Sequence, residues 1–134
     1  MDYVRVANLE ASSGQNLASR VTGSEKCRIG LSRVAPGAGS PSGLHIHEVD
    51  QLCYVLKGTL KMEIGTDPYE PGVEIKTEFV SAGPNTLLVV PAGIPHRNWN
   101  DGPEAEYHLD ILVPEPEPGR PGSTTVRDQS ARGP

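Results

Sequence analysis

The chain has few cysteines and few aromatic residues. Its 134 residues include two Cys, one Trp and one Phe. Two cysteines cannot build a disulfide scaffold. Because Cys27 and Cys53 fall in strand-like segments without CxxC spacing, we expect buried thiols rather than a disulfide or zinc ligands. One Trp and one Phe also provide no stacking platform for nucleic acid bases.

The chain also lacks a basic run and a long apolar run. Its formal net charge is −5, so a groove that follows a phosphate backbone is not expected and a polyanionic substrate would be repelled. No apolar run reaches the roughly 18 residues of a membrane span, and the N-terminus lacks a secretory signal pattern. We therefore expect a cytoplasmic protein that binds neither nucleic acid nor membrane and takes a weakly polar ligand.

Glycine, proline and alternating strand patterns are abundant instead. With 15 Gly and 13 Pro, long helices have little room, and the length fits one domain. Strand-like segments cover residues 27–34, 51–56, 59–64, 73–79, 86–90 and 105–113. Gly58 predicts a tight hairpin, and period two in 73–79 predicts a half-buried strand with Val73, Ile75 and Phe79 on the buried face. The pattern predicts an all-β sandwich or barrel closed in jelly-roll fashion.

The four histidines carry the clearest chemical signal. His45 and His47 are two positions apart, so in an extended strand their side chains point to the same face. A third, His96, lies in the string PAGIPHRNWN. Neutral imidazole is a common ligand of zinc, iron, nickel and copper, and a firm site needs at least three converging donors. We therefore predict that His45, His47 and His96 hold one metal ion.

This spacing resembles the two signature motifs of the cupin superfamily. The first motif is matched by Gly43, His45, His47, position 51 and Gly58, which delimit residues 43–58. The second, residues 91–100, is matched by Pro91, Gly93, His96 and Asn100. The resemblance implies the cupin jelly-roll fold, the same architecture that the strand pattern predicts, and Asn100 is expected to be structural.

Two positions depart from the cupin pattern. Gln51 replaces the Glu ligand that the family usually has, and Asn85 replaces the Gly with which the second motif normally begins. An amide in place of a carboxylate leaves a divalent ion less neutralised and therefore a stronger Lewis acid. Gln51 is expected either to bind the metal through its side-chain oxygen or to orient the ligands. The change at Asn85 affects only a turn.

Two residues of the late strand-like segment 105–113 are further candidates. His108 would face the same interior if this strand lines the barrel, which would make it a fourth metal ligand; the alternative is a pocket or core residue. Asp110 shares its strand parity and is a candidate general base, because burial would raise the pKa of its carboxyl group. The alternative for Asp110 is a structural hydrogen bond.

Within the cupins, the chain most resembles the small cyclases of bacterial aromatic polyketide pathways, of the resistomycin cyclase type. The similarity lies in chain size, in the His-His-Gln first motif and in the Pro-rich C-terminal end, and it is strongest over Gly43 to Asn100. It implies a zinc enzyme that closes the first rings of a poly-β-ketone chain by intramolecular aldol condensation. Such an enzyme works beside a polyketide synthase, its acyl carrier protein and other cyclases, with Asp110 or a metal-bound water as the base.

Two other functions fit the same residues. In the first alternative, the ion is iron, nickel or copper, and the protein is a dioxygenase that acts on a diketone or flavonol. The second is a non-catalytic cupin that binds a small molecule. The second has less support, because binding cupins often lose the motif histidines that this chain keeps.

The domain organisation is expected to be simple. Residues 1–113 form the cupin domain, and residues 114–134, with almost no apolar content, form a mobile Pro/Gly-rich tail. In the segment Tyr107 to Val113 both faces are largely apolar. A strand without a polar face is covered on both sides, so we expect a contact outside the barrel and a homodimer.

Overall fold

The fold consists of β-strands throughout the part of the chain that the structure, a computed structural model, describes: residues 26–39, 43–114, 117 and 122–127. The strands there are β1 (Arg28–Val34), β2 (Leu44–Ile46), β3 (Asp50–Lys57), β4 (Leu60–Gly65), β5 (Thr77–Ala82), β6 (Leu87–Val90), β7 (His96–Trp99), β8 (Glu106–Val113) and β9 (Thr124–Arg127). No helix long and apolar enough to cross a membrane occurs among these residues.

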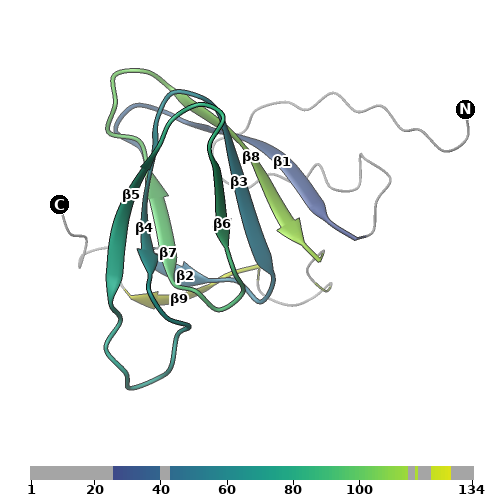
Figure 1. The fold of residues 1–134 in the computed structure, drawn as a ribbon, viewed down its shortest axis with the longest axis vertical. Helices are drawn as coiled ribbons and strands as arrows, with labels where there is room; N and C mark the ends of the chain where they lie inside the picture. The colour runs from purple at the N-terminus through teal and green to yellow at the C-terminus, as the bar shows by residue number, and fades with distance from the viewer. Residues whose placement is uncertain (1–25, 40–42, 115–116, 118–121, 128–134) are drawn as a thin grey trace, which may run out of the picture.

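The strands form two antiparallel sheets that face each other (Figure 1). The four-stranded sheet has the order β1-β8-β3-β6, and the five-stranded sheet has the order β5-β4-β7-β2-β9. Apart from the consecutive pair β4 and β5, neighbouring strands in both sheets are not consecutive in sequence, as expected for a jelly roll. The predicted all-β sandwich is therefore confirmed.

The apolar core lies between the sheets. Its fully buried members are contributed by β3, β4, β5 and β6: Cys53, Val55, Leu60, Met62, Ala82 and Val90. On β3 these residues alternate with less buried ones. On β4 Leu60 and Met62 flank the half-buried Lys61, but Glu63 on the opposite face is buried as well. Cys53 is a free thiol and is completely buried, as expected, whereas Cys27 is only partly buried, contrary to the expectation.

The hairpin between β3 and β4 depends on Gly58. Its φ is +78°, a conformation that residues with a Cβ rarely adopt. A Cβ added there would lie 2.8 Å from the backbone oxygen of Ala105. Gly58 therefore allows both the turn and the close approach of the segment that leads into β8.

The strand expected over 73–79 is wrong in its start and in its buried face. Only β5, from Thr77, is extended, while Val73 donates a backbone hydrogen bond to Glu70 in a turn. Val73 and Phe79 are 57% and 50% exposed. Phe79 pairs with Glu63 on the outer face of the sheet, whereas Val80 pairs with the buried Met62. The edge position of β5 explains the error, because an edge strand can leave apolar side chains exposed.

The expected mobile tail over 114–134 is wrong for the residues that the structure describes near its end. Thr124 to Arg127 form β9, which pairs with β2 at the edge of the five-stranded sheet. Thr124, Thr125 and Val126 are β-branched and favour extended backbone, although the segment as a whole is polar. Residues 115–116, 118–121 and 128–134 of the expected tail lie outside the described residues.

Candidate metal centre

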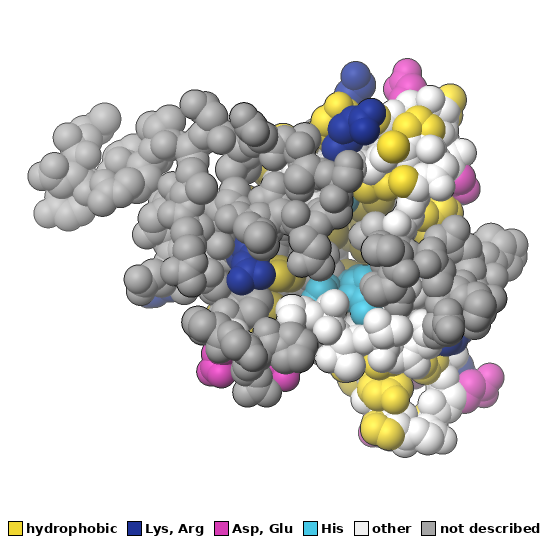
Figure 2. Space-filling model, turned by 180° about the vertical axis from the view of Figure 1, so that it is seen from behind, with side chains coloured by type: hydrophobic (Ala, Val, Ile, Leu, Met, Phe, Trp, Pro, Cys, Tyr) yellow, Lys and Arg dark blue, Asp and Glu magenta, His cyan; other side chains and the backbone are white. Residues whose placement is uncertain are grey.

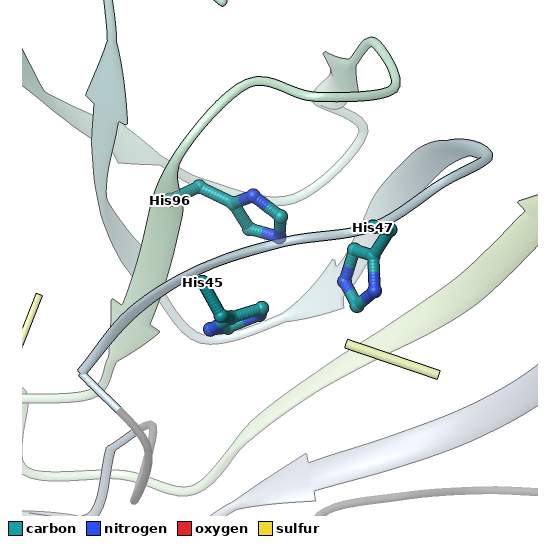
Figure 3. A group of neighbouring side chains, drawn as sticks. All are labelled: His45, His47 and His96. Atoms are coloured by element: carbon teal, nitrogen blue, oxygen red, sulfur yellow. The ribbon is translucent and has the colours of Figure 1, made fainter. Parts of the chain in front are cut away.

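Three histidines lie close together: one on β2, one directly after β2 and one on β7 (Figure 3). His45 of β2 pairs with His96 of β7 across the five-stranded sheet, and His47 follows β2 directly. One ring nitrogen from each of the three lies within 4.8 Å of the others. The ring centroids are 4.4 Å apart for His45 and His96 and 5.0 Å apart for each of the other two pairs. The structure thus brings together the three ligands that the sequence predicts.

A backbone carbonyl lies beside the Nδ1 atom of each histidine. Nδ1 of His45 is 3.1 Å from the oxygen of Gly43, and Nδ1 of His96 is 2.9 Å from that of Ile94. Nδ1 of His47 is 2.6 Å from the oxygen of Gly122, a residue 75 positions away in the chain. A carbonyl only accepts hydrogen bonds, so each Nδ1 carries the proton and each Nε2 keeps its lone pair.

The Nε2 atoms have the features of metal ligands. Those of His47 and His96 are buried and have no hydrogen-bond partner among the described residues. A buried imidazole nitrogen without a partner is unfavourable unless it binds something. Histidine side chains reach the surface on the face shown in Figure 2. Three tautomerically fixed imidazoles with converging lone pairs fit a divalent metal ion of the zinc or iron type.

Burial keeps two of these imidazoles neutral. Desolvation, the charge of His45 and the charge of His47 lower the pKa of His96 to about 3, against the opposing hydrogen bond to Ile94. Burial is also the largest cause that lowers the pKa of His45; the Gly43 hydrogen bond and the Asp110 charge oppose it, and His47 adds to it. A metal ion therefore meets little competition from protons at neutral pH.

Gln51 and Asp110 form a hydrogen-bonded pair that faces the same interior from the four-stranded sheet. Nε2 of Gln51 donates to Oδ1 of Asp110 at 2.7 Å, and the thiol of Cys53 lies 4.0 Å from the same oxygen. Burial, together with the charges of Asp110 and Glu106, raises the pKa of Cys53 well above its ordinary value, so the thiol stays protonated. Oε1 of Gln51 is buried without a partner among the described residues, which leaves it available as a weak ligand.

His108 does not join the group of three. Its ring is buried on β8, and its Nδ1 lies 2.8 Å and 3.0 Å from the two carboxylate oxygens of Glu106. The geometry therefore favours the alternative interpretation of His108 as a buried interior residue. Glu106 is itself completely buried, and sequence reasoning missed it. Its spacing of two from His108 on a predicted strand was the signal that placed both side chains on one face.

The remaining motif positions have structural roles. The side-chain amide of Asn100 donates to the backbone oxygens of Val34 and Glu104, at 2.9 Å and 2.7 Å, and its oxygen accepts from Gly102, as expected for a structural residue. Asn85 has a φ of +65°, and its side-chain oxygen accepts a hydrogen bond from Tyr54. Asparagine tolerates this left-handed conformation better than most residues, so it can replace the glycine of the motif.

Two facing antiparallel sheets with three converging imidazoles define an all-β protein with a candidate mononuclear metal centre. The profile of one family, described as "Cupin domain", matches residues 30–112, more than half of the chain. The protein therefore belongs to the cupin family. No curated protein matches the chain.

Solved structures support the fold. TT1209 from Thermus thermophilus is 26% identical with a TM-score of 0.56, and the match covers 69% of this chain and 77% of that one. Oxalate decarboxylase of Bacillus subtilis, an enzyme with Mn(II) centres, is 19% identical with a TM-score of 0.61, over 81% of this chain and 26% of that one. The DMSP lyase DddQ from Ruegeria pomeroyi is 13% identical with a TM-score of 0.58, over 79% and 46%. The chain thus spans only a quarter of the decarboxylase and less than half of the lyase.

Proposed function

We propose that the protein is a zinc-dependent cyclase that closes rings in a poly-β-ketone chain by intramolecular aldol condensation. The observation that carries the proposal is the ligand set. Among the described residues, His45, His47 and His96 form a group that could hold a metal ion, and no carboxylate belongs to this group. Gln51 occupies the motif position where the family usually supplies a Glu, so the site adds no negative charge to the ion.

His45, His47 and His96 would hold the zinc, and Gln51 would complete or orient the ligand set. Zinc, when bound, supplies Lewis acidity that polarises a ketone oxygen and makes the neighbouring C–H more acidic. Such polarisation is strongest where neutral ligands leave the positive charge of the ion intact. The neutral imidazoles and the amide are suited to this task.

Asp110 is the proposed base that removes the α-proton. Its carboxylate is half-buried on β8 and faces the interior that His45 borders, since its charge acts on the pKa of His45. Both of its hydrogen bonds, from Gln51 and Cys53, go to Oδ1. Two donors on one oxygen fix the orientation of the carboxylate and direct Oδ2 to the substrate, where it can accept the proton.

The interior around this pair suits a ligand with little charge. Cys53, whose thiol lies 4.0 Å from Asp110, belongs to the buried apolar cluster that also contains Val55, Leu60 and Met62. A poly-β-ketone is largely apolar with regularly spaced carbonyl oxygens, which matches such surroundings. The proposed partners are the acyl carrier protein that delivers this chain and the other cyclases of the same pathway.

The test combines metal analysis with two assays. The purified protein is expected to contain one zinc per chain and to convert a poly-β-ketone, made in place by a polyketide synthase, into a cyclised product without consuming dioxygen. The matched control is His45→Ala, which should give the spontaneous product mixture. Dioxygen uptake with a 1,3-diketone or flavonol that tracks bound iron, nickel or copper would establish the dioxygenase function instead. Tight ligand binding without turnover would indicate a binding cupin.

A further inference from the structure

The C-terminal segment lies directly against the metal centre. The carbonyl oxygen of Gly122 accepts the Nδ1 proton of His47 at 2.6 Å. The corresponding acceptors for His45 and His96 are Gly43 and Ile94, each only two residues from its histidine. His47 is thus the one histidine of the three that depends on a distant part of the chain for its orientation.

The segment is attached to the strand that carries His45. Strand β9 pairs with β2 along its length, with Thr125 opposite His45 and Arg127 opposite Leu44. Strand β9 is an edge strand, and β2 is its one neighbour in the sheet. Four residues at an edge provide few backbone hydrogen bonds, so β9 needs a further anchor to stay in place.

Arg127 supplies this anchor. Its guanidinium forms an ion pair with Oε1 of Glu63, a residue of β4 that is only 2% exposed. Glu63 also accepts hydrogen bonds from Nε of Arg97 and Oγ1 of Thr77, both at 2.7 Å. Because Arg97 and Thr77 stay on Glu63 when Arg127 is removed, this buried carboxylate would keep two partners. A change at Arg127 should therefore loosen β9 without unfolding the rest of the sheet.

We propose that Arg127 and Glu63 are positioning residues of the metal centre: by docking β9 they hold the Gly122 carbonyl against His47, so metal binding and β9 docking strengthen each other. The inference rests on the metal binding proposed above. A ligand that is oriented by a hydrogen bond binds its metal more tightly, and typical losses on removing such a bond are about 10- to 100-fold. Linkage requires the reverse effect as well, in which the metal stabilises the docked strand.

The first experiment follows amide hydrogen exchange in the full-length protein with and without zinc. Zinc is expected to slow exchange in residues 124–127 by about tenfold or more. Strand β5 is the matched control. It forms the opposite edge of the same sheet and carries none of His45, His47 and His96. Equal protection of β5 and β9, or no protection of β9 while zinc is bound, would overturn the proposal.

The second experiment measures zinc affinity by competition with a chelating dye. Arg127→Ala is expected to weaken zinc binding by roughly three- to tenfold, because the residue acts one step away from the ligand. Arg127→Lys should recover part of the loss. Lys61→Ala is the matched control, since it removes one positive charge and the ion pair to Asp101 from the same sheet. Equal affinities for Arg127→Ala and the wild type would contradict the inference.

A third comparison separates this inference from the proposed function. In zinc-free protein, His47→Ala should speed exchange in residues 124–127, whereas His96→Ala should not, because Nδ1 of His47 donates to Gly122 while Nδ1 of His96 donates to Ile94. If the wild type binds no zinc, the proposed function fails while this comparison still tests the contact. If zinc binds but the two variants exchange alike, the positioning role fails and the cyclase proposal is untouched.

Discussion

The side-chain amide of Gln51 donates a 2.7 Å hydrogen bond to the carboxylate of Asp110, across β3 and β8. The amide therefore does what a carboxylate at this position cannot do. A Glu would face Asp110 as a like charge and would repel it. The replacement of the usual family Glu and the presence of Asp110 are thus two parts of one arrangement.

Gln51→Glu tests this arrangement. We expect zinc affinity to hold or rise, because a charged ligand is added, while cyclisation falls by about 10- to 100-fold as the ion is neutralised and Asp110 loses its donor. Dye competition and product formation measure the two effects. Gln51→Leu is the control that removes the donor without adding charge. An unchanged rate in Gln51→Glu would show that Gln51 is only scaffolding.

His45→Ala should empty the metal centre, because the remaining donors lose the pair that projects from one strand. Zinc content is expected to fall from one ion per chain to near zero after dialysis, by elemental analysis. His108→Ala is the comparison, and it should retain zinc because His108 binds Glu106 and lies outside the group of three. Loss of zinc from His108→Ala would restore the fourth-ligand role that the sequence suggests.

The metal-free protein should lose stability as the pH falls below about 6.5. In the folded state the pKa of His96 is about 3, while in the unfolded chain a histidine titrates near 6.5. Between these values the unfolded state binds more protons, so the contribution of His96 is complete above about pH 6.5 and declines by about 2 kcal/mol by pH 5.

Urea unfolding at several pH values measures this dependence. His96→Gln should show a flatter profile over the same range, since glutamine does not titrate. A wild-type profile as flat as that of His96→Gln would show that His96 is not held neutral by burial.

Gly58→Ala should destabilise the fold more than Gly72→Ala. Both glycines have positive φ, +78° and +82°, so both substitutions incur backbone strain of about 1–2 kcal/mol. Only at Gly58 would the new Cβ lie 2.8 Å from a backbone oxygen, whereas nothing lies within 4 Å at Gly72. We expect a further loss of about 1–3 kcal/mol at Gly58, measured by thermal or urea unfolding. Equal losses of stability in the two variants would mean that the segment leading into β8 moves away from the new Cβ at little cost.

A homodimer remains the expected assembly. The outer face of the four-stranded sheet exposes Leu87 and Val89 at 49% and 53%, beside half-buried apolar residues of β3 and β8. Val89→Asp should shift the protein to a monomer in light scattering after size exclusion, because a charge would be buried in the contact. Phe79→Asp, on the other sheet and 50% exposed, is the control and should leave the mass unchanged. A monomeric wild type would disprove the expectation.

The sequence predicted the motif histidines and the fold because short-range rules determine both. His45 and His47 share a face by strand alternation, and β4 has apolar residues at every second position, namely Leu60, Met62 and Ile64. The sequence did not predict the partner of His47. Gly122 is 75 residues away, and the contact is made by its backbone oxygen, which every residue type has. It misplaced β5 and β9 because both are edge strands, whose burial depends on what they pair with.

Strand β7 holds two neighbours of opposite chemistry on opposite faces. His96 points to the metal centre, while Arg97 is buried on the other side, with its Nε on Glu63 and its guanidinium 4.6 Å from the Trp99 ring centroid. A slip of one residue would exchange their faces. The permanent positive charge of Arg97 would then lie at the metal centre, and Glu63 would lose its hydrogen bond from Arg97. The alternation of His96 and Arg97 thereby penalises mispairing of a strand only four residues long during folding.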